Sequence, residues 1–228
     1  MEIGAITIMA VGAHIGDAEL TMGGTLATCS KKGGKIITVA LTAGEKGVPA
    51  GRDIDEYKKQ KINEARTFAE MLGGEAVVLK YNDGELPDNE EVRYELCDLI
   101  REYKPNLLLT HWKGTLHKDH ELAHKIVLDA QFYAGVAGFQ RAKPAHYAGG
   151  PYFAENWEDA PGYVPYIYMN ITEGYELWLK AAATHEFVTK SASFKYLDYY
   201  DHLSFVRGCE CRKERAETYM VGPYQMRI

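Results

Sequence analysis

The stretch "AITIMAVGAHIGDAEL", residues 5–20, joins an apolar run to a polar segment. The run is typical of a buried β-strand, and "DAEL" is typical of the first turn of a helix. His14, Asp17 and Glu19 therefore lie where a strand passes into a helix. Gly16 lies among them, and a residue without a side chain is unexpected in so polar a segment.

The following segments alternate between strand and helix patterns as far as residue 111. Strand patterns cover 35–42, 75–81 and 106–111, and helix patterns cover 19–34, 54–72 and 90–103. This alternation predicts an α/β fold of Rossmann-like type, with a mostly parallel sheet and helices on both faces. In such sheets, ligands bind at the carboxyl ends of the strands.

The second half of the chain has weaker patterns. Residues 135–162 are rich in Gly, Pro and aromatic residues, which predicts a long surface segment that borders a pocket or forms a subunit contact. A strand is expected within 163–172 and helices around 175–187 and 211–220. No repeat or linker divides the chain, so we expect a single domain over 1–228.

Composition excludes several classes of protein. The net charge is −6, and "RKER" at 212–215, which we expect on a helix face, is too short to indicate nucleic-acid binding. The apolar runs are too short to span a membrane. Glu2 stands where a signal peptide would be basic, so a cytoplasmic location is expected. The four cysteines are predicted to be reduced structural thiols, with a redox or metal role for Cys209 and Cys211 as the alternative.

Two polar clusters follow predicted strands. His14 and Asp17 form one, and the segment 117–124 adds His117, Asp119, His120 and His124. Two nitrogens and one carboxylate oxygen, with the remaining positions left to water, are the ligands of a catalytic zinc site. Taken alone, each residue also suits a turn, a helix cap or a solvated helix face. Their shared position at strand ends favours the metal site.

These segments resemble a known family along nearly the whole chain. "VGAHIGDAELTMGGTLA" is similar to the AHPDD and GGTLA signature of the LmbE/PIG-L family of zinc-dependent N-acetylglucosaminide deacetylases, and "HKDH" is similar to its HPDH motif. "LTAGEKG", "NEARTFAEMLGG", "NDGEL", "AAATHEF" and "RAETYMVG" match further family segments in the same order. The resemblance implies that His14, Asp17 and His120 hold zinc. It also implies that His117 stabilises or protonates the tetrahedral intermediate, with Asp119 orienting it.

The chain departs from the family at the general base. Gly16 stands where the family has the aspartate that takes a proton from the attacking water, and Ile15 replaces a proline. General acid–base catalysis contributes about 10²- to 10⁴-fold, so slow hydrolysis could survive the loss. Glu45 and Asp119 are the nearest candidates for a relocated base. His124 is left without a role, and we expect it on the helix surface or supporting a ligand.

Other departures concern the substrate. Lys61 replaces an arginine of the family pattern, and Phe187 replaces a serine. We expect Lys61 and Asp83, the latter in the "NDGEL" turn, to bind substrate. An ammonium group is not equivalent to a planar guanidinium, so no particular sugar can be transferred from the family.

Three functions are consistent with these observations. The first is a metal-dependent hydrolase that removes an acetyl group from an N-acyl amino sugar, with an altered base at Gly16. The alternative is a catalytically weakened paralogue that binds metal and carbohydrate. A third is a non-haem Fe²⁺ enzyme with the same two histidines and one carboxylate. The expected partner is a small-molecule amino sugar, and the expected assembly is a homo-oligomer.

Overall fold

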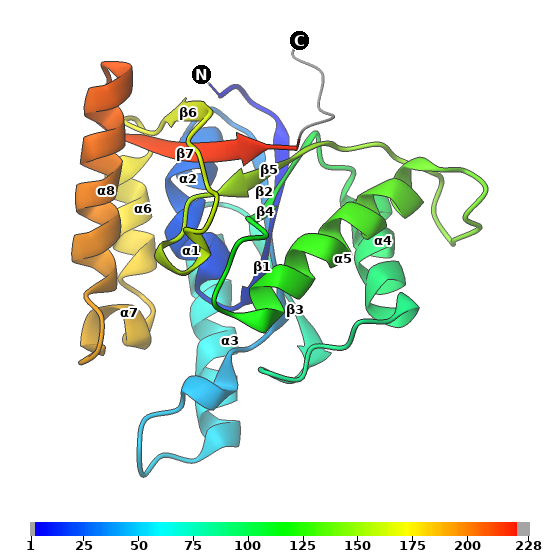
Figure 1. Cartoon of the computed structure of the whole chain (residues 1–228), viewed down its shortest axis with the longest axis horizontal. Helices are drawn as coiled ribbons and strands as arrows, with labels where there is room; N and C mark the ends of the chain where they lie inside the picture. The colour runs from blue at the N-terminus through cyan, green and yellow to red at the C-terminus, as the bar shows by residue number, and fades with distance from the viewer. Residues whose placement is uncertain (1–2, 223–228) are drawn as a thin grey trace.

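A seven-stranded sheet runs through the structure, a computed structural model that describes residues 3–222 (Figure 1). Its strands are β1 Thr7–His14, β2 Lys35–Thr42, β3 Glu75–Tyr81, β4 Leu107–His111, β5 Gly149–Ala154, β6 Ile167–Asn170 and β7 Ala216–Val221. The order is β3-β2-β1-β4-β5-β7-β6. Strands β1 to β5 are parallel, whereas β7 is antiparallel to both β5 and β6. The predicted mostly parallel α/β fold is confirmed.

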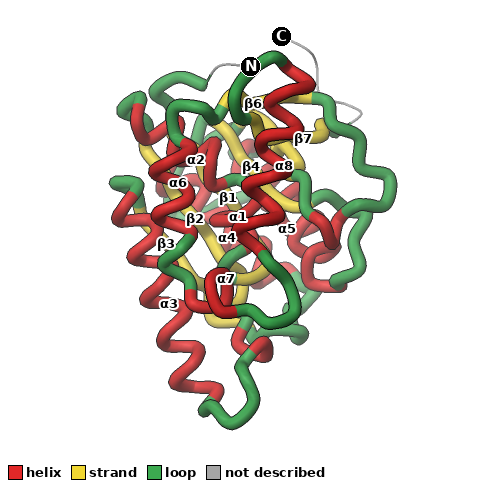
Figure 2. Tube along the Cα trace, turned by 90° about the vertical axis from the view of Figure 1, so that its left-hand side faces the viewer, coloured by secondary structure: helices red, strands yellow, loops and turns green. Residues whose placement is uncertain are grey.

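Helices cover both faces of this sheet. They are α1 Asp17–Thr21, α2 Gly23–Lys31, α3 Ile54–Met71, α4 Glu90–Tyr103, α5 Lys118–Gly135, α6 Tyr175–Ala182, α7 Glu186–Lys190 and α8 Tyr196–Cys211, with short 3₁₀ turns η1 Glu45–Gly47 and η2 Trp157–Asp159. Helices α4 and α5 lie on one side of the sheet in Figure 1, and α2, α6 and α8 lie on the other. Figure 2 shows α6 and α8 in front of the strands.

Strand β1 is buried on both faces, which explains its unbroken apolar run. Ile8 and Ala10 belong to the core on the α2 and α6 side, and Met9 and Val11 belong to the core on the α4 and α5 side. This period of two is the alternation of side chains along a strand. A central parallel strand such as β1 is expected to supply apolar side chains to the cores on both faces of the sheet.

The strand order positions the candidate site. It reverses at β1, because β2 and β3 lie on one side of it and β4 and β5 on the other. A crevice forms at the carboxyl ends of the strands where such an order reverses. His14 ends β1, and His111 ends the adjacent parallel strand β4. Both clusters of polar residues therefore meet at the same edge of the sheet.

The single helix predicted over 19–34 is divided into α1 and α2 at Met22. Met22 has a φ of −130°, outside the helical range, and the two glycines that follow it are closely packed. A Cβ atom at Gly23 would lie 2.4 Å from Trp178 Cδ1, and one at Gly24 would lie 2.4 Å from Ile171 Cδ1. The two glycines therefore let α2 approach the neighbouring segments more closely than any other residue type would allow.

The helix predicted around 211–220 is wrong, because α8 ends at Cys211 and residues 216–221 form β7. Arg212 has a left-handed φ of 59°, which ends the helix, so 212–215 lie in a turn instead of on a helix face. Helix-forming residues such as Ala216 and Glu217 are strand residues here because tertiary contacts outweigh propensity. Glu217 accepts hydrogen bonds from Gly24 N and Thr25 N at the start of α2.

Residues 135–162 were expected to be a surface segment, but they contain β5 and η2. Phe153 and Ala154 of β5 are buried in the sheet. Within residues 3–222, no helix has the length and hydropathy needed to cross a membrane. Cys29 and Cys97 are buried, and burial raises the pKa of both thiols.

Candidate metal centre

The turn between β1 and α1 places the first cluster. Gly16 has a φ of +112°, a conformation that other residues rarely adopt, and it reverses the chain between His14 and Asp17. Glu19 Oε2 accepts a hydrogen bond from Gly16 N at 2.9 Å, and Asp17 Oδ2 accepts one from His14 N at 2.7 Å. These bonds hold the Asp17 carboxylate beside the His14 ring.

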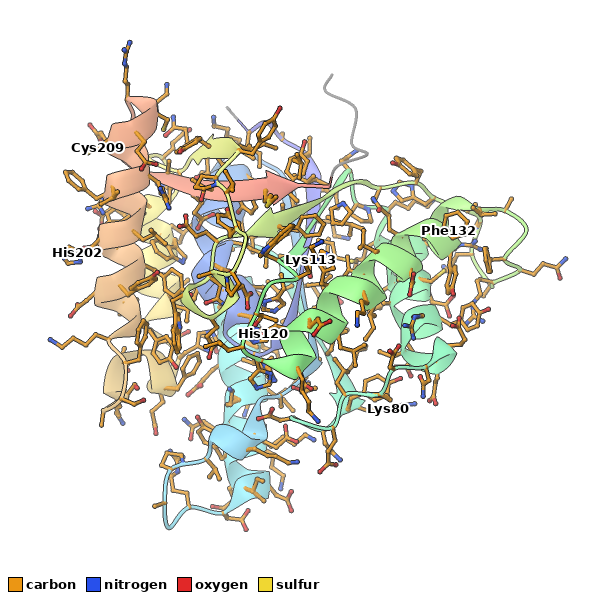
Figure 3. All side chains as sticks on the ribbon, viewed as in Figure 1. Lys80, Lys113, His120, Phe132, His202 and Cys209 are labelled. Carbon is orange, nitrogen blue, oxygen red and sulfur yellow. The ribbon has the colours of Figure 1, made fainter. Side chains whose placement is uncertain are left out.

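The second cluster lies at the start of α5, where Figure 3 labels His120 near the middle of the molecule. His117 caps this helix, because its Nδ1 accepts a hydrogen bond from Asp119 N at 3.2 Å. With Nδ1 as acceptor, the proton of a neutral His117 is on Nε2. His120 lies one turn further along and is buried.

Three donor atoms from the two clusters converge. Asp17 Oδ2 lies 3.3 Å from His14 Nδ1 and 3.6 Å from His120 Nε2. Ligand atoms about 2.0–2.3 Å from a zinc ion are about 3–4 Å from one another in a tetrahedral shell. Asp17 Oδ2 is therefore close to one nitrogen of each histidine, and two imidazoles with one carboxylate suit zinc or Fe²⁺. Three groups have ligand atoms that all lie within 4.8 Å of one another: Asp17 with His111 and His120, His14 with His117 and His120, and His14 with Asp83 and Asp119.

Asp159 fixes the orientation of the histidines on the β4 and α5 side, and it was missed in the sequence. Its Oδ1 lies 3.0 Å from His120 Nδ1 and its Oδ2 lies 2.9 Å from His111 Nδ1. A carboxylate on the far nitrogen of a ligating histidine sets its tautomer and ring orientation. Asp159 follows β5. Prediction of a strand within 135–162 would have placed Asp159 after the carboxyl end of that strand and so made it a candidate site residue.

His111 is a further donor that the sequence analysis did not select. Its Nε2 lies 3.1 Å from Asp17 Oδ2 and accepts a hydrogen bond from Ala13 N at 3.1 Å. Asp17, His111 and His120 have donor atoms within 4.8 Å of one another. His124 is buried and supports this arrangement, because its Nδ1 donates to the carbonyl oxygen of His111 at 2.9 Å.

Negative charge surrounds His14. Its Nε2 lies 3.1 Å from Asp83 Oδ1 and 3.5 Å from Asp119 Oδ2, without the alignment of a hydrogen bond. Burial lowers the pKa of His14, but Asp119, Asp17 and Asp83 outweigh it and raise that pKa to about 11. Asp119 Oδ1 is buried and has no hydrogen-bond partner. A field this favourable to positive charge also suits a metal cation.

Other pKa shifts agree with this pattern. Burial opposes the ionisation of Asp17, yet the charges of His120 and His111 hold the pKa of Asp17 well below its usual value. Burial is the largest cause that lowers the pKa of His117, and repulsion from His14 and His120 lowers it further. A neutral His117 with its proton on Nε2 can donate a hydrogen bond to a carbonyl oxygen.

A cavity of about 660 Å³ opens beside these donors. Lys61, Asp83 and His117, three of the predicted functional residues, line it. Asp83 Oδ2 also accepts a hydrogen bond from Lys46 N at 3.0 Å. Glu45 is buried behind Asp83, because its Oε1 accepts from Asp83 N at 3.0 Å while its Oε2 has no partner.

The carboxylate of Asp119 faces His14 instead of His117. Its Oδ2 accepts a hydrogen bond from Gly84 N at 2.7 Å. Only the backbone N of Asp119 contacts the His117 ring. Glu158, a residue missed in the sequence, lines the cavity with its carboxylate 3.9 Å from His120 Nδ1, and burial raises the pKa of Glu158.

The space beside Gly16 is filled by an aromatic ring. A Cβ atom at Gly16 would lie 2.3 Å from Phe187 Cζ. Lys61 Nζ lies 4.8 Å from the centre of the same ring, and both residues line the cavity. The two departures from the family pattern at Gly16 and Phe187 are therefore one packing contact, and the three atoms nearest to a Cβ at Gly16 all belong to the Phe187 ring.

Removal of the Asp159 carboxylate is expected to weaken metal binding. Asp159→Asn should lower metal affinity by about 10- to 100-fold, because His111 and His120 lose the charged group that orients them. Zinc titration with a competing chelator measures the change. Asp198→Asn, at an exposed position on α8, is the control. Equal affinity in Asp159→Asn and wild type would contradict the orienting role.

His185 should make the protein sensitive to acid. It is fully buried with no hydrogen-bond partner on either ring nitrogen, and burial lowers its pKa from 6.5 to about 3. Between these values the unfolded chain binds a proton that the folded chain does not, so stability is lost as pH falls through this window. For His185→Leu, the loss in unfolding free energy from pH 7 to pH 5 should be about 2 kcal/mol smaller than in wild type.

Urea unfolding at the two pH values measures this difference. His202→Leu is the control, because His202 is exposed on α8. An unchanged pH dependence in His185→Leu would show that His185 is not the acid-sensitive group.

A mostly parallel α/β sheet with histidine and aspartate donors at its carboxyl edge defines a candidate metal-binding α/β protein. A family model described as PIG-L, GlcNAc-PI de-N-acetylase, matches residues 9–131, which is more than half of the chain. The chain therefore belongs to the PIG-L family, as its sequence motifs predicted.

Two relatives of known activity are similar in sequence. A diacetylchitobiose deacetylase of Thermococcus kodakarensis is 26% identical over 193 residues, covering 78% of this chain and 68% of the relative. A 1D-myo-inositol 2-acetamido-2-deoxy-alpha-D-glucopyranoside deacetylase of Corynebacterium glutamicum is 29% identical over 152 residues, covering 55% of this chain and 52% of the relative. The match spans about half the length of the second relative.

Solved structures share the fold. The 4-carboxy-2-hydroxymuconate hydratase GalB of Pseudomonas putida superposes with a TM-score of 0.87 at 20% identity, covering 98% of this chain and 99% of GalB. An N,N'-diacetylchitobiose deacetylase of Pyrococcus horikoshii superposes with a TM-score of 0.81 at 21% identity, covering 96% and 84%. One fold thus serves a hydratase and a deacetylase, so the chemistry depends on the site.

Proposed function

We propose that this protein is a metal-dependent amide hydrolase that removes the acetyl group of an N-acetyl amino sugar. The convergence of His14, Asp17 and His120 beside a cavity of about 660 Å³ carries the proposal. Such a volume suits a sugar-sized ligand. Deacetylases among the sequence relatives support the choice of an N-acetyl sugar.

His14, Asp17 and His120 would hold the metal, which we propose to be zinc, with Fe²⁺ as the other metal suited to these ligands. When bound, such an ion supplies a Lewis acid for the amide carbonyl and lowers the pKa of water. Asp83 and Asp119 hold negative charge around His14, and Asp159 orients His120. These carboxylates keep the donor nitrogens in place.

His117 would act on the reacting amide. Its Nε2 proton is available because Nδ1 already accepts from Asp119 N. The ring lines the cavity and can donate a hydrogen bond to the oxygen that becomes negative as the carbonyl is attacked. The same proton can then pass to the leaving amine. Lys61 and Asp83 line the cavity and would contact the sugar.

The proton of the attacking water must go to a group other than residue 16. Glu45 and Asp119 were the candidates in the sequence, and each has one buried carboxylate oxygen without a hydrogen-bond partner. Glu158 is a third candidate, because it lines the cavity and its carboxylate lies 3.9 Å from His120 Nδ1, beyond hydrogen-bond distance. Asp17 and Asp83 are already committed to neighbouring groups.

Acetate release from a panel of N-acetylglucosaminides identifies the proton acceptor. We expect wild type to be active and one of Glu45→Gln, Asp119→Asn and Glu158→Gln to lose about 10²- to 10⁴-fold in kcat. Zinc content and unfolding temperature separate this loss from loss of metal or fold. Equal kcat in all three variants would contradict a carboxylate base.

A second candidate function is the metal- and carbohydrate-binding paralogue. The ring of Phe187 in the space beside Gly16 favours it, because the usual base is replaced by a group that cannot accept a proton. Sugar binding by the zinc-loaded protein, with no acetate released from any member of the panel, would decide for this function.

A further inference from the structure

Lys61 is a buried amine in the cavity wall. It comes from α3, is 6% exposed and lines the cavity beside the metal donors. Its Nζ donates one hydrogen bond, to Gly44 O at 3.3 Å, and stacks on Phe187 at 4.8 Å from the ring centre. An ammonium group has three donors, so this environment leaves it short of acceptors.

No carboxylate compensates the Lys61 charge by direct contact. Four carboxylates act on it from a longer distance, namely Asp17, Asp83, Glu19 and Glu64. None of them forms an ion pair with Lys61 in the part of the chain that the structure describes, and each is bound elsewhere. Burial of a charge without a partner costs free energy, so a bound anion would be favoured at this position.

The amine is close to the metal donors. A Cβ atom at Gly44 would lie 2.8 Å from Lys61 Nζ and 3.1 Å from His14 Cβ. Gly44, with a φ of +66°, therefore lies between the amine and the His14 side chain and, having no side chain itself, lets them lie close together. A group held by Lys61 would therefore lie near the metal donors.

The charge of the cavity depends on the metal. Three carboxylates, Asp17, Asp83 and Glu158, and two lysines, Lys61 and Lys190, line it. A bound divalent cation would add two positive charges beside Lys61, which is the buried cation of this wall, and so would make the cavity more favourable to an anion.

We propose that Lys61 binds an anionic group of the substrate, a carboxylate or a phosphate, next to the amide that is hydrolysed. This inference rests on the proposed function, whose amino-sugar substrate it restricts to an acidic one. A sugar hydroxyl could accept a hydrogen bond from Lys61 but would leave its charge uncompensated. An anion satisfies both the hydrogen-bonding capacity and the charge.

Binding of sugars that cannot be hydrolysed tests the proposal. The probes are glucosamine as the reference without an acidic group, glucosamine 1-phosphate and glucosamine 6-phosphate for phosphate, and muramic acid for carboxylate. Isothermal titration of the zinc-loaded protein gives each Kd. We expect at least one acidic sugar to bind about 10- to 100-fold more tightly than glucosamine, as for a hydrogen bond to a charged group. The probe that binds more tightly shows whether the anionic group bound by Lys61 is a phosphate or a carboxylate.

Variants assign the preference to Lys61. Lys61→Met keeps the length of the side chain and should abolish the preference, whereas Lys61→Arg should retain it. Lys190→Met removes an exposed charge from the same cavity and should leave the preference unchanged. Unfolding temperature and zinc content show that each variant is folded and loaded.

Three results would overturn the inference: equal binding of the acidic sugars and glucosamine, no binding of any probe, or a preference that persists in Lys61→Met. The proposed function is judged separately. Release of acetate from neutral N-acetylglucosamine without any preference for acidic sugars would refute the role of Lys61 and leave the hydrolase intact.

Discussion

His120→Ala should lose tight zinc binding and, with it, all metal-dependent acetate release. The substitution removes one of three converging donors, and Asp159 then faces only His111. Loss of a group that merely orients a ligand costs about 10- to 100-fold in metal affinity, so loss of the ligand itself should cost more than 100-fold. Competition with a chelator measures the zinc affinity.

His202→Ala is the matched control, because His202 lies on the outer face of α8, away from His120 (Figure 3). It should bind zinc and release acetate as wild type does. His120 is buried, so unfolding of the metal-free variant must be measured too. A folded His120→Ala that keeps wild-type zinc affinity would show that the ion, if bound, is held by other residues.

Gly16→Asp should destabilise the protein and should not restore a general base. The position has a φ of +112°, and a Cβ atom there would lie 2.3 Å from Phe187 Cζ. Backbone strain costs about 1–3 kcal/mol. Overpacking costs about 1–3 kcal/mol more. Urea unfolding should show the sum of both effects.

Two further variants separate the two costs. Gly33 has a φ of +82° with open space around it, so Gly33→Asp carries the backbone cost alone. Phe187→Ser removes the ring. In that background, Gly16→Asp should lower the free energy of unfolding by about 1–3 kcal/mol less than it does in wild type, because the packing cost is absent. Additive effects at Gly16 and Phe187 would contradict the contact. A stable, more active Gly16→Asp single variant would contradict the account of this turn.

Much of the first half of the fold follows from periodicity. The apolar runs predict β2 and β3 at their observed bounds, and the helical pattern over 90–103 predicts α4. Strand β2 is buried almost throughout and α4 buries one face, so local preference and tertiary packing agree there, whereas β3 is only half-buried. At residues 216–221 the two conflict, and pairing with β5 and β6 prevails over helix propensity.

The site could be predicted in part. The structure places Asp17 Oδ2 close to both His14 and His120, because the ends of parallel strands share one edge of the sheet. Asp159 and Glu158 could not be predicted, because the strand before them, β5, has no recognisable strand pattern in a segment rich in Gly, Pro and aromatic residues. Their sequence position gives no indication that they face α5.

Contacts between distant segments were also out of reach of the sequence. Gly16 and Phe187 were each recognised as a departure from the family pattern, but nothing in the sequence places one against the other. Only the packing of α7 beside the β1–α1 turn makes them a single feature. It also shows why a carboxylate cannot simply be returned to position 16.

Acetate release measured during zinc titration tests the central claim most directly. Metal-stripped protein is titrated with zinc in the presence of a panel of neutral and acidic N-acetylglucosaminides. The account predicts that release from at least one of them rises with zinc and levels off at one equivalent per chain, in wild type and not in His120→Ala. Release that is absent at every zinc concentration, or that does not depend on zinc, would contradict it.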